Sequence, residues 1–424
     1  MWALVLPILL FLTIINYRSF RDLRYPPFIM SALWFVVMTL YYSAPTPIHS
    51  ISVVTAFIFV AAVISFTFGG QLAFLCKSNP YVRKAPDKGL ALLRAHHPRV
   101  KKMLLLASIA LLPALLYKAR QLADLSGVDN FFMGLRIELL SEGSPGYGLI
   151  GNATILSFFT TFIYSIELDN KKWEKAEYFC SLMLSLVYAV LTTGRLAIFL
   201  VLVALTGIAL IKRRFSVKKL ILGILIFVLA FAAISMVLGK GGELNAPWSD
   251  NIITIGQTLR PYVIGSVPAF DLMVRENAPL TWGENTFSGF LNFVYRMEGH
   301  RLISEIPGDV SVPFTTNVYT ALRPSYKDFG ILGVTLSLVL IGAASTYFYF
   351  KAVAGDQLYV LYYAISLVPL LLMTVGDQYF GPALSWAKYF LAGYLYFRTG
   401  GNGVRSVAFR GRQDFLVTVP PRRP

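Results

Sequence analysis

The stretch Thr316-Asn-Val-Tyr-Thr-Ala-Leu-Arg323-Pro-Ser-Tyr-Lys-Asp-Phe-Gly-Ile-Leu-Gly333 passes from polar to apolar sequence, and the rest of the chain is interpreted from it. Behind it lies a polar segment from Gly239 to Lys327, and ahead of it lies a long apolar run. A run of about 20 apolar residues is long enough to cross the hydrocarbon core of a bilayer. The stretch therefore marks the point where a large extramembrane loop enters a membrane span.

Composition indicates the same class of protein. The chain is 56% hydrophobic and only 14% charged, with a mean hydropathy of +0.62, whereas soluble domains carry about 25% charged residues. These values exclude a soluble globular protein. Because backbone polar groups in lipid must be paired within the spanning segment, we predict an all-α polytopic membrane protein that forms a single integral domain over residues 1–424.

Apolar runs of membrane length recur along the chain and predict about 11 transmembrane helices. The predicted spans cover residues 1–17, 28–44, 50–75, 103–117, 148–167, 177–191, 196–211, 220–238, 329–350, 358–374 and 380–397. The large polar loop covers residues 239–327, and a basic tail covers residues 398–424. The first run lacks a basic start and a cleavage site, so we expect it to be retained as an anchor.

The distribution of basic residues predicts the orientation. If the segment Arg18–Pro27 is cytoplasmic, 26 of the 38 lysines and arginines fall on inner segments, as the positive-inside rule requires. We therefore expect a periplasmic N-terminus, a cytoplasmic C-terminus and a large periplasmic loop. The net charge of +16 then faces anionic membrane lipids rather than nucleic acid. Cys76 and Cys180 fall at cytoplasmic ends of spans, so we expect no disulfide.

Several motifs carry no chemistry. Gly146-Tyr-Gly-Leu-Ile-Gly151 matches a dinucleotide-binding pattern by letter, but it opens a span and follows no strand. His96 and His97 lie in a basic loop without nearby cysteine or carboxylate ligands. We therefore predict neither a metal site nor a cofactor.

Arginines on the predicted outer face are the candidate binding residues. Arg195 lies in a very short turn between spans, and Arg260, Arg296 and Arg323 are each flanked by aromatic residues or proline in apolar surroundings. The planar guanidinium forms two parallel hydrogen bonds with phosphate and keeps its charge when partly desolvated. Convergence of such residues at the membrane surface suits a lipid-linked pyrophosphate. Arg296 is a weaker candidate, as is Arg136 on an amphipathic stretch.

Each of these residues also has a simpler interpretation. Arg195 can extend outward to the headgroups, and Arg136 can be an ordinary surface residue. Four outer tyrosines offer hydrogen bonds and stacking surfaces for sugars, namely Tyr262, Tyr295, Tyr319 and Tyr326. Aromatic residues also gather at membrane interfaces without binding anything.

Three short motifs give the chain a family resemblance. Thr316-Asn317-Val-Tyr319, followed by Asp328-Phe-Gly330-Ile-Leu-Gly333, resembles the outer-loop signature of Wzy-type oligosaccharide repeat-unit polymerases, the O-antigen polymerase family. Tyr262-Val-Ile-Gly265 and Thr193-Gly-Arg195 are similar to further motifs of that family. The number of spans and the position of the large loop also fit.

The resemblance implies a metal-independent glycosyltransferase of the bacterial inner membrane. Such an enzyme polymerises undecaprenyl pyrophosphate-linked oligosaccharides into O-antigen or a related surface polysaccharide at the periplasmic face. It implies membrane lipids as surroundings and a chain-length regulator of the polysaccharide co-polymerase type as a partner.

The resemblance and the residue chemistry together assign provisional roles. Arg195, Arg260 and Arg323 are expected to bind pyrophosphate. His300 is the candidate general base because of its intrinsic pKa, with Glu298 and Glu284 as alternatives. Structural roles are expected for three further residues, with Asp328 as the cap of the ninth span: Asn317, Asp328 and Gly330.

Two other functions remain open. An O-antigen ligase, which transfers finished glycan to the lipid A core, would use similar arginines. A polysaccharide flippase or transporter would need internal repeats or charged residues at mid-membrane depth, and Lys388 is the one charge that the sequence places within a span. We expect Lys388 to make a contact within the helix bundle.

Overall fold

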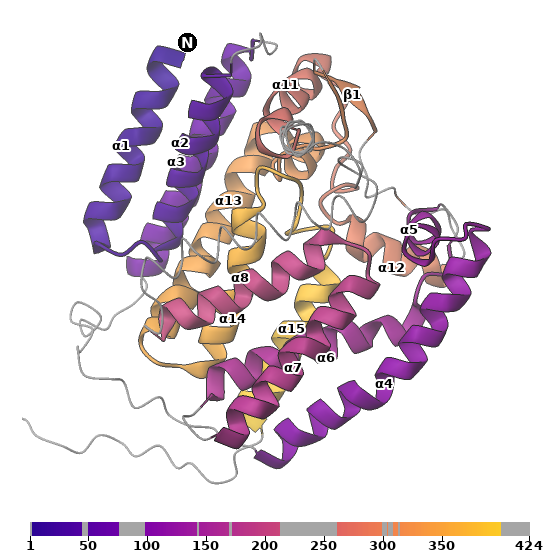
Figure 1. Ribbon diagram of the computed structural model, residues 1–424. Coiled ribbons are helices and arrows are strands. Elements are labelled where there is room, and N and C mark those ends of the chain that lie inside the picture. The colour runs from indigo at the N-terminus through magenta and orange to yellow at the C-terminus, as the bar shows by residue number, and fades with distance from the viewer. Residues whose placement is uncertain are drawn as a thin grey trace, which may run out of the picture.

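The computed structural model describes residues 2–44, 50–75, 98–141, 144–168, 172–212, 261–298, 303, 308–312 and 314–399. The described chain is almost entirely helical (Figure 1). Its helices are α1 (Trp2–Phe20), α2 (Pro26–Tyr42), α3 (Val53–Leu75), α4 (Pro98–Leu125), α5 (Phe131–Leu140), η2 (Gly148–Gly151), α6 (Asn152–Glu167), α7 (Lys172–Leu191), α8 (Arg195–Ile211), η3 (Pro261–Gly265), α11 (Ser266–Glu276), α12 (Ser288–Glu298), α13 (Arg323–Val353), α14 (Gln357–Leu371), α15 (Ala383–Tyr394) and η4 (Leu395–Thr399). A short antiparallel hairpin pairs β1 (Val310–Ser311) with β2 (Thr315–Thr316).

The all-α fold class is confirmed for the described part of the chain. Each predicted span that falls there contains a helix, whereas the predicted span 220–238 lies outside the described residues. Within the described ranges, four helical segments are long and apolar enough to cross a membrane, namely Val53–Leu75, Pro98–Leu125, Gly148–Glu167 and Arg323–Val353. The outer faces of the bundle expose large apolar side chains such as Leu4, Phe11 and Leu340, which is the arrangement expected against lipid.

Some span boundaries differ from the prediction. The fourth helix, α4, runs from Pro98 to Leu125 rather than over residues 103–117. The added first turn contains Lys101, which pairs within the protein: its Nζ lies 3.3 Å from Oε2 of Glu167 on α6, and both side chains are almost fully buried. Helix α13, which contains the ninth predicted span, begins at Arg323. The last five residues of the predicted loop are therefore helical.

A close helix crossing joins the N-terminal helices to the rest of the bundle. Helix α13 packs along α3, and Gly69 and Gly342 lie at the contact. A Cβ atom built on Gly69 would lie 2.0 Å from the carbonyl oxygen of Val339, and one on Gly342 would lie 2.2 Å from that of Phe66. Only glycine permits two backbones to approach this closely in a membrane bundle.

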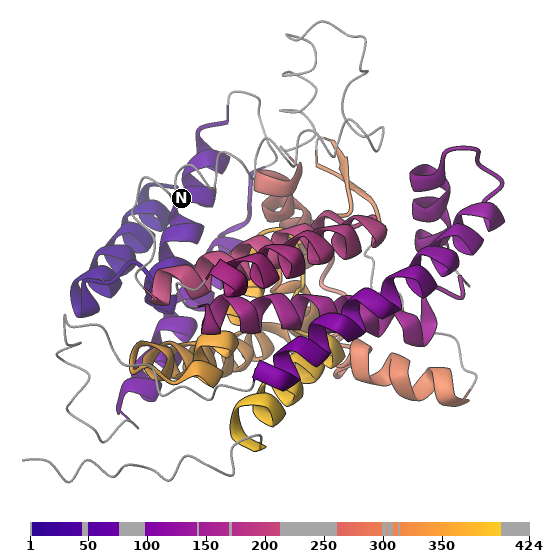
Figure 2. The same cartoon turned by 60° about the horizontal axis from the view of Figure 1, so that its bottom comes forward.

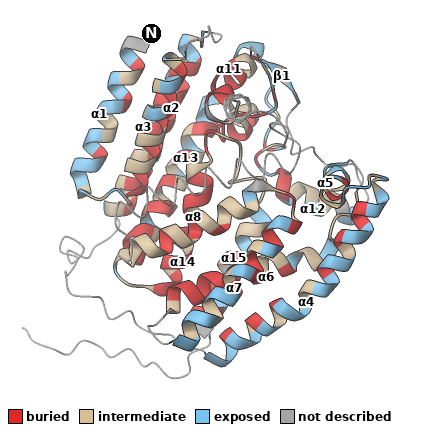
Figure 3. Ribbon diagram, in the orientation of Figure 1, coloured by how far each residue is buried: buried red, intermediate tan, exposed pale blue. Residues whose placement is uncertain are grey.

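Burial increases toward the middle of the bundle (Figure 3). Most side chains of α14 are buried, whereas α4 is largely exposed along its outer side. Figure 2 shows α4 running diagonally across the bundle toward α5. The elements between α8 and α13, including α11, α12 and the hairpin, gather toward one end of the bundle, called here the loop end. The turn between α1 and α2 lies at the other end, called here the opposite end.

Candidate functional site

A cavity of about 410 Å³ lies at the loop end of the bundle. Five described segments contribute to its walls: the start of α8, the turn before α12 with the first residue of that helix, Ile303 between α12 and β1, the segment that leads into α13, and the connection between α14 and α15. The walls carry both polar and apolar groups. The lining includes Leu196, Asn285, Ser288, Ile303, Asn317, Val318, Tyr319, Thr320, Arg323, Pro324, Val375, Gly376, Asp377, Gln378, Gly381 and Pro382.

Arg323 is the cation that the described structure places on this lining. It is the first residue of α13, and its backbone N–H donates to the carbonyl of Thr320 at 3.1 Å. The preceding turn is fixed to the turn that follows α14, because the N–H of Ala321 donates to the carbonyl of Met373 at 2.8 Å. The guanidinium lies 5.4 Å from the centre of the Tyr319 ring, a cation–π distance. Among the described residues, none forms a hydrogen bond or ion pair with this guanidinium.

Asp377 lines the cavity from the connection between α14 and α15. Its carboxylate accepts backbone hydrogen bonds from Tyr379, Phe380 and Gly381 at 2.9, 3.0 and 2.8 Å, which folds the turn before α15. Burial raises the pKa of the Asp377 carboxyl, and these hydrogen bonds and the charge of Arg323 offset only part of that rise. The cavity thus holds a carboxylate whose proton affinity is greater than that of an ordinary aspartate.

Uncharged polar groups complete the cavity. The amides of Asn285, Asn317 and Gln378 and the hydroxyl of Ser288 belong to lining residues. Thr320 is fully buried, and its hydroxyl has no hydrogen-bond partner among the described residues. Native structures leave few buried hydroxyls unpaired. Thr320 therefore brings an unpaired hydroxyl to the cavity wall.

Asp328 stabilises the wall that precedes α12 rather than capping the ninth span, as the sequence had suggested. The buried carboxylate accepts hydrogen bonds from the backbone N–H groups of Asn285 and Thr286 at 3.1 and 2.5 Å. It also accepts from the side chains of Thr281 and Asn285 at 2.5 and 2.9 Å. Gly330 follows with φ 62° and ψ −149°, a conformation suited to glycine, and this kink separates Arg323 from the long part of α13.

The predicted pyrophosphate-binding residues are described unevenly. Arg323 lines the cavity. The backbone of Arg195 starts α8 next to the lining residue Leu196, but its side chain lies outside the described part, as does that of Arg296 on α12. Arg260 and His300 lie wholly outside the described residues.

Other predicted site residues lie away from the described lining. Arg136 is on α5 and Tyr262 is in η3. Tyr326 packs its ring against Phe270 with ring centres 5.5 Å apart. Two acidic candidates, Glu284 and Glu298, are exposed and do not belong to the described cavity lining.

Tyr319 and Asn317 do lie on the cavity lining, and Lys388 lies elsewhere in the bundle. The Nζ atom of Lys388 donates to Oδ1 of Asn152 on α6 at 2.8 Å. The expectation of a bundle contact for Lys388 is therefore confirmed.

Asp377, Gln378 and Thr320 were not identified from the sequence. The available signal was a carboxylate beside glycine, Gly376-Asp377, in a connection of about five residues between two predicted spans. Such a short connection keeps its side chains at the membrane surface. An ionisable residue there is a candidate site residue by default.

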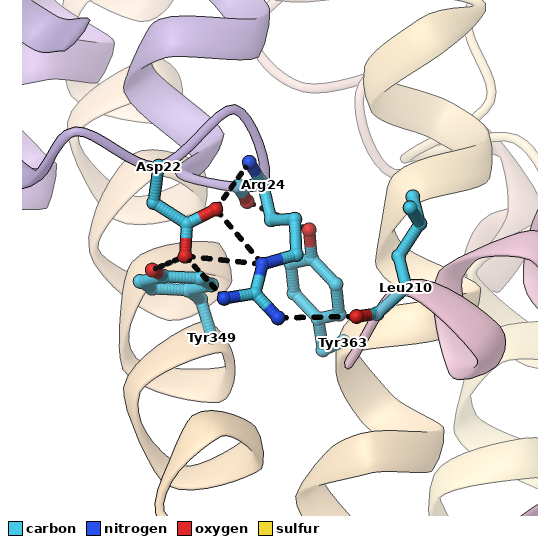
Figure 4. Close-up of polar contacts among 5 residues, drawn as sticks. All are labelled: Asp22, Arg24, Leu210, Tyr349 and Tyr363. Atoms are coloured by element: carbon cyan, nitrogen blue, oxygen red, sulfur yellow. Dashed lines mark hydrogen bonds and ion pairs between the residues drawn. The ribbon is translucent and has the colours of Figure 1, made fainter. Parts of the chain in front are cut away.

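A second polar cluster, at the opposite end, contains paired charges (Figure 4). The guanidinium of Arg24 binds both oxygens of Asp22, with the shortest distance 2.5 Å, and donates to the carbonyl of Leu210 at 3.1 Å. Tyr349 on α13 donates to Asp22 at 2.7 Å, and Tyr363 on α14 donates to the carbonyl of Arg24 at 2.7 Å. This cluster joins the α1–α2 turn to three later helices.

Comparisons with known proteins agree with the apolar architecture. The family model described as "Putative O-antigen polymerase" matches residues 22–374. A protein of Shigella dysenteriae named "O-antigen polymerase" is 32% identical over 273 residues, which cover 62% of this chain and 65% of that relative. The match thus spans just under two thirds of the length of this curated relative. No solved structure matches the chain.

Proposed function

Because the chain belongs to the O-antigen polymerase family, we propose that it is a glycosyltransferase that joins lipid-linked oligosaccharide repeat units into O-antigen or a related surface polysaccharide. The lipid carrier is undecaprenyl pyrophosphate. The concentration of 26 of the 38 basic residues on the predicted inner segments supports a reaction at the periplasmic face of the inner membrane.

The observation that carries this proposal is the guanidinium of Arg323. It lies in a cavity wall against Tyr319, and no described carboxylate pairs with it. A partly desolvated cation is costly unless an anion accompanies it, so the site suits a ligand that brings negative charge. In the proposed reaction the pyrophosphate of the donor is that anion. Arg195, Arg260 and Arg296 are proposed as further contacts to it.

In the reaction an acceptor hydroxyl oxygen attacks the anomeric carbon of the donor glycan. A new carbon–oxygen bond forms, the bond from that carbon to the pyrophosphate oxygen breaks, and the pyrophosphate leaves with the electron pair. Negative charge therefore grows on the leaving group, where a positioned arginine stabilises it more strongly than in the ground state. We assign that role to Arg323.

The acceptor hydroxyl must also lose a proton. Asp377 lies on the same cavity wall, and its raised pKa makes it a stronger base than an ordinary aspartate. It therefore joins His300, Glu298 and Glu284 as a candidate general base, with the advantage that it lines the cavity. The amides of Asn317 and Gln378 and the hydroxyl of Thr320 are proposed to bind sugar hydroxyls.

The test is a reconstituted assay with purified protein and a synthetic undecaprenyl pyrophosphate-linked repeat unit as both donor and acceptor. We expect a ladder of products differing by one repeat unit, one released lipid pyrophosphate per linkage, and the same ladder in EDTA. Ladders that require added divalent metal would refute the metal-independent step. Transfer that occurs only when lipid A core is supplied would identify a ligase, and lipid translocation without bond formation would identify a transporter.

A further inference from the structure

A second cavity, of about 350 Å³, lies between α13, α14 and α15. We call it the apolar groove. Hydrocarbon side chains and aromatic rings dominate its lining, with two serine residues and Tyr379 as the polar members. The lining residues are Ile341, Ala344, Ser345, Phe348, Ile365, Ser366, Pro369, Tyr379, Ala383, Trp386, Ala387 and Phe390.

The groove has a closed floor and an open mouth. Ile365 and Pro369 of α14 are buried and form the floor. Three alanines are exposed at the mouth, Ala344 on α13 and Ala383 and Ala387 on α15. Because Ala383 and Ala387 are four residues apart on one helix, they lie on the same face. The smallest apolar side chain thus occurs on both lips, which leaves the groove accessible from the outer surface of the bundle.

The apolar groove and the polar cavity share one wall. Gln378 and Pro382 line the polar cavity, whereas the neighbouring residues Tyr379 and Ala383 line the groove. Trp386, whose ring lines the groove, donates its indole N–H to the carbonyl of Gln378 at 2.7 Å. A ligand with a polar end in the cavity and an apolar end in the groove would therefore need to cross only this turn.

We propose that the apolar groove binds the first isoprenoid units of the lipid carrier while its pyrophosphate lies beside Arg323. This inference rests on the proposed function, because it assigns one amphiphilic donor to two adjoining sites. Tyr379 lines the groove and directly follows Gln378 of the polar cavity, and its buried hydroxyl has no hydrogen-bond partner among the described residues. Such a hydroxyl is suited to the first phosphate oxygen, where the polar and apolar parts of the donor meet.

The kinetic test closes the mouth of the groove without altering the polar cavity. Ala387→Phe and, separately, Ala344→Phe are compared with Ala110→Phe, a matched change at an exposed position of α4. Donors carry the same glycan on either an undecaprenyl chain or a short soluble chain. We expect KM for the long-chain donor to rise about tenfold in both lip variants, since excluding about two methylene groups loses that much affinity. KM for the short-chain donor stays unchanged, and the α4 variant behaves as the wild type.

Equal KM changes for the two donors, or no change for the long-chain donor in either lip variant, would overturn the proposal. If one lip variant does not accumulate as folded protein, the KM values of the other variant test the proposal, because the two substitutions are on different helices. This outcome differs from failure of the proposed function, in which the wild-type protein forms no glycosidic bond with either donor.

A binding test is independent of turnover. Purified protein is irradiated with a polyprenyl phosphate that carries a diazirine on its second isoprene unit, and the labelled peptides are mapped. We expect labelling of the lining of α13, α14 and α15 in the wild type and in Ala110→Phe, and loss of it in the lip variants. Equal labelling of the groove by a diazirine-bearing phosphatidylglycerol would show an ordinary bilayer lipid there and would contradict the assignment.

Discussion

Arg24 and Arg323 both lie at ends of the helix bundle, but their surroundings differ. Arg24 binds Asp22 and the carbonyl of Leu210, and its side chain is only 17% exposed (Figure 4). Arg323 lies in a cavity wall beside Tyr319, and no described residue forms a hydrogen bond or ion pair with its guanidinium. One arginine has its anion within the protein, and the other faces a space of about 410 Å³.

Arg24 is thus a charge that stabilises the fold, whereas Arg323 is a charge that is available to bind a ligand. Removing one partner of a buried ion pair leaves the other uncompensated and costs stability. A cation without a protein partner contributes little to stability, yet it contributes binding energy when an anion arrives. Loss of Arg24 should therefore affect the amount of folded protein, and loss of Arg323 should affect the reaction.

The largest expected effect is on the reaction. Arg323→Ala should lower the rate of polymerisation per folded molecule by about tenfold to a hundredfold, because a charge-assisted contact contributes about 1.5–3 kcal/mol. Arg323→Lys should restore only part of the rate, since an ammonium group cannot form the paired hydrogen bonds of a guanidinium. Product ladders normalised to membrane-inserted protein measure both. A lysine variant as active as the wild type would show that Arg323 serves only as a point charge, and an active alanine variant would remove it from the site.

The matched change at the opposite end should have the reverse pattern. Arg24→Ala should lower the free energy of unfolding by about 1–3 kcal/mol, because the largely buried Asp22 loses the guanidinium and keeps only its hydrogen bonds from Tyr349 and from the backbone N–H of residue 24. Activity per folded molecule should stay close to that of the wild type. Thermal unfolding in detergent and the same ladder assay provide the two measurements. If Arg24→Ala reduced the rate in correctly folded protein, the proposed contrast between the two arginines would fail.

A smaller effect, on pH dependence, distinguishes the two carboxylates. Burial would raise the pKa of Asp22, but hydrogen bonds from Arg24 and Tyr349 outweigh it and hold the pKa below its ordinary value. The stability that Asp22 contributes is therefore present above its unfolded-state pKa and is lost as the pH falls through its lowered folded-state pKa. The pKa of Asp377 is raised instead. Acidification should thus protonate Asp377 first.

We therefore expect the polymerisation rate to fall on acidification while the protein remains folded. Rate and unfolding temperature are measured across the same pH series for the wild type, Asp377→Asn and Asp22→Asn. Asp377→Asn should remove the fall in polymerisation rate at low pH. Asp22→Asn should weaken the dependence of the unfolding temperature on acidification. If an active Asp377→Asn variant still lost rate at low pH as the wild type does, the general base would instead be His300, Glu298 or Glu284.

The helices could be predicted from sequence because their cause is local. A backbone in lipid must pair its own polar groups, so an apolar run of sufficient length is helical wherever the rest of the chain lies. The boundaries were less predictable because they depend on distant partners. The early start of α4 goes with Lys101, whose partner Glu167 is on another helix.

The site was predictable only in part for the same reason. Arg323 was identified from its own neighbours, since an arginine between apolar residues and proline is unlike a solvated charge. Asp377 was missed, because its importance comes from the cavity that joins it to Arg323, more than fifty positions earlier in the chain. Asp328 was recognised as structural, but the turn that it stabilises begins at Thr281.

The crossing of Gly69 and Gly342 has a consequence for how substitutions in this protein are interpreted. A single methyl group at either position would overlap a carbonyl oxygen of the facing helix. Even replacement of the glycine by alanine would therefore force α3 and α13 apart. Alleles with changes there would be null because the protein does not assemble, although the positions lie far from the cavity. A genetic screen that scores only surface polysaccharide would group these alleles with Arg323 variants, and a parallel measure of protein abundance would separate them.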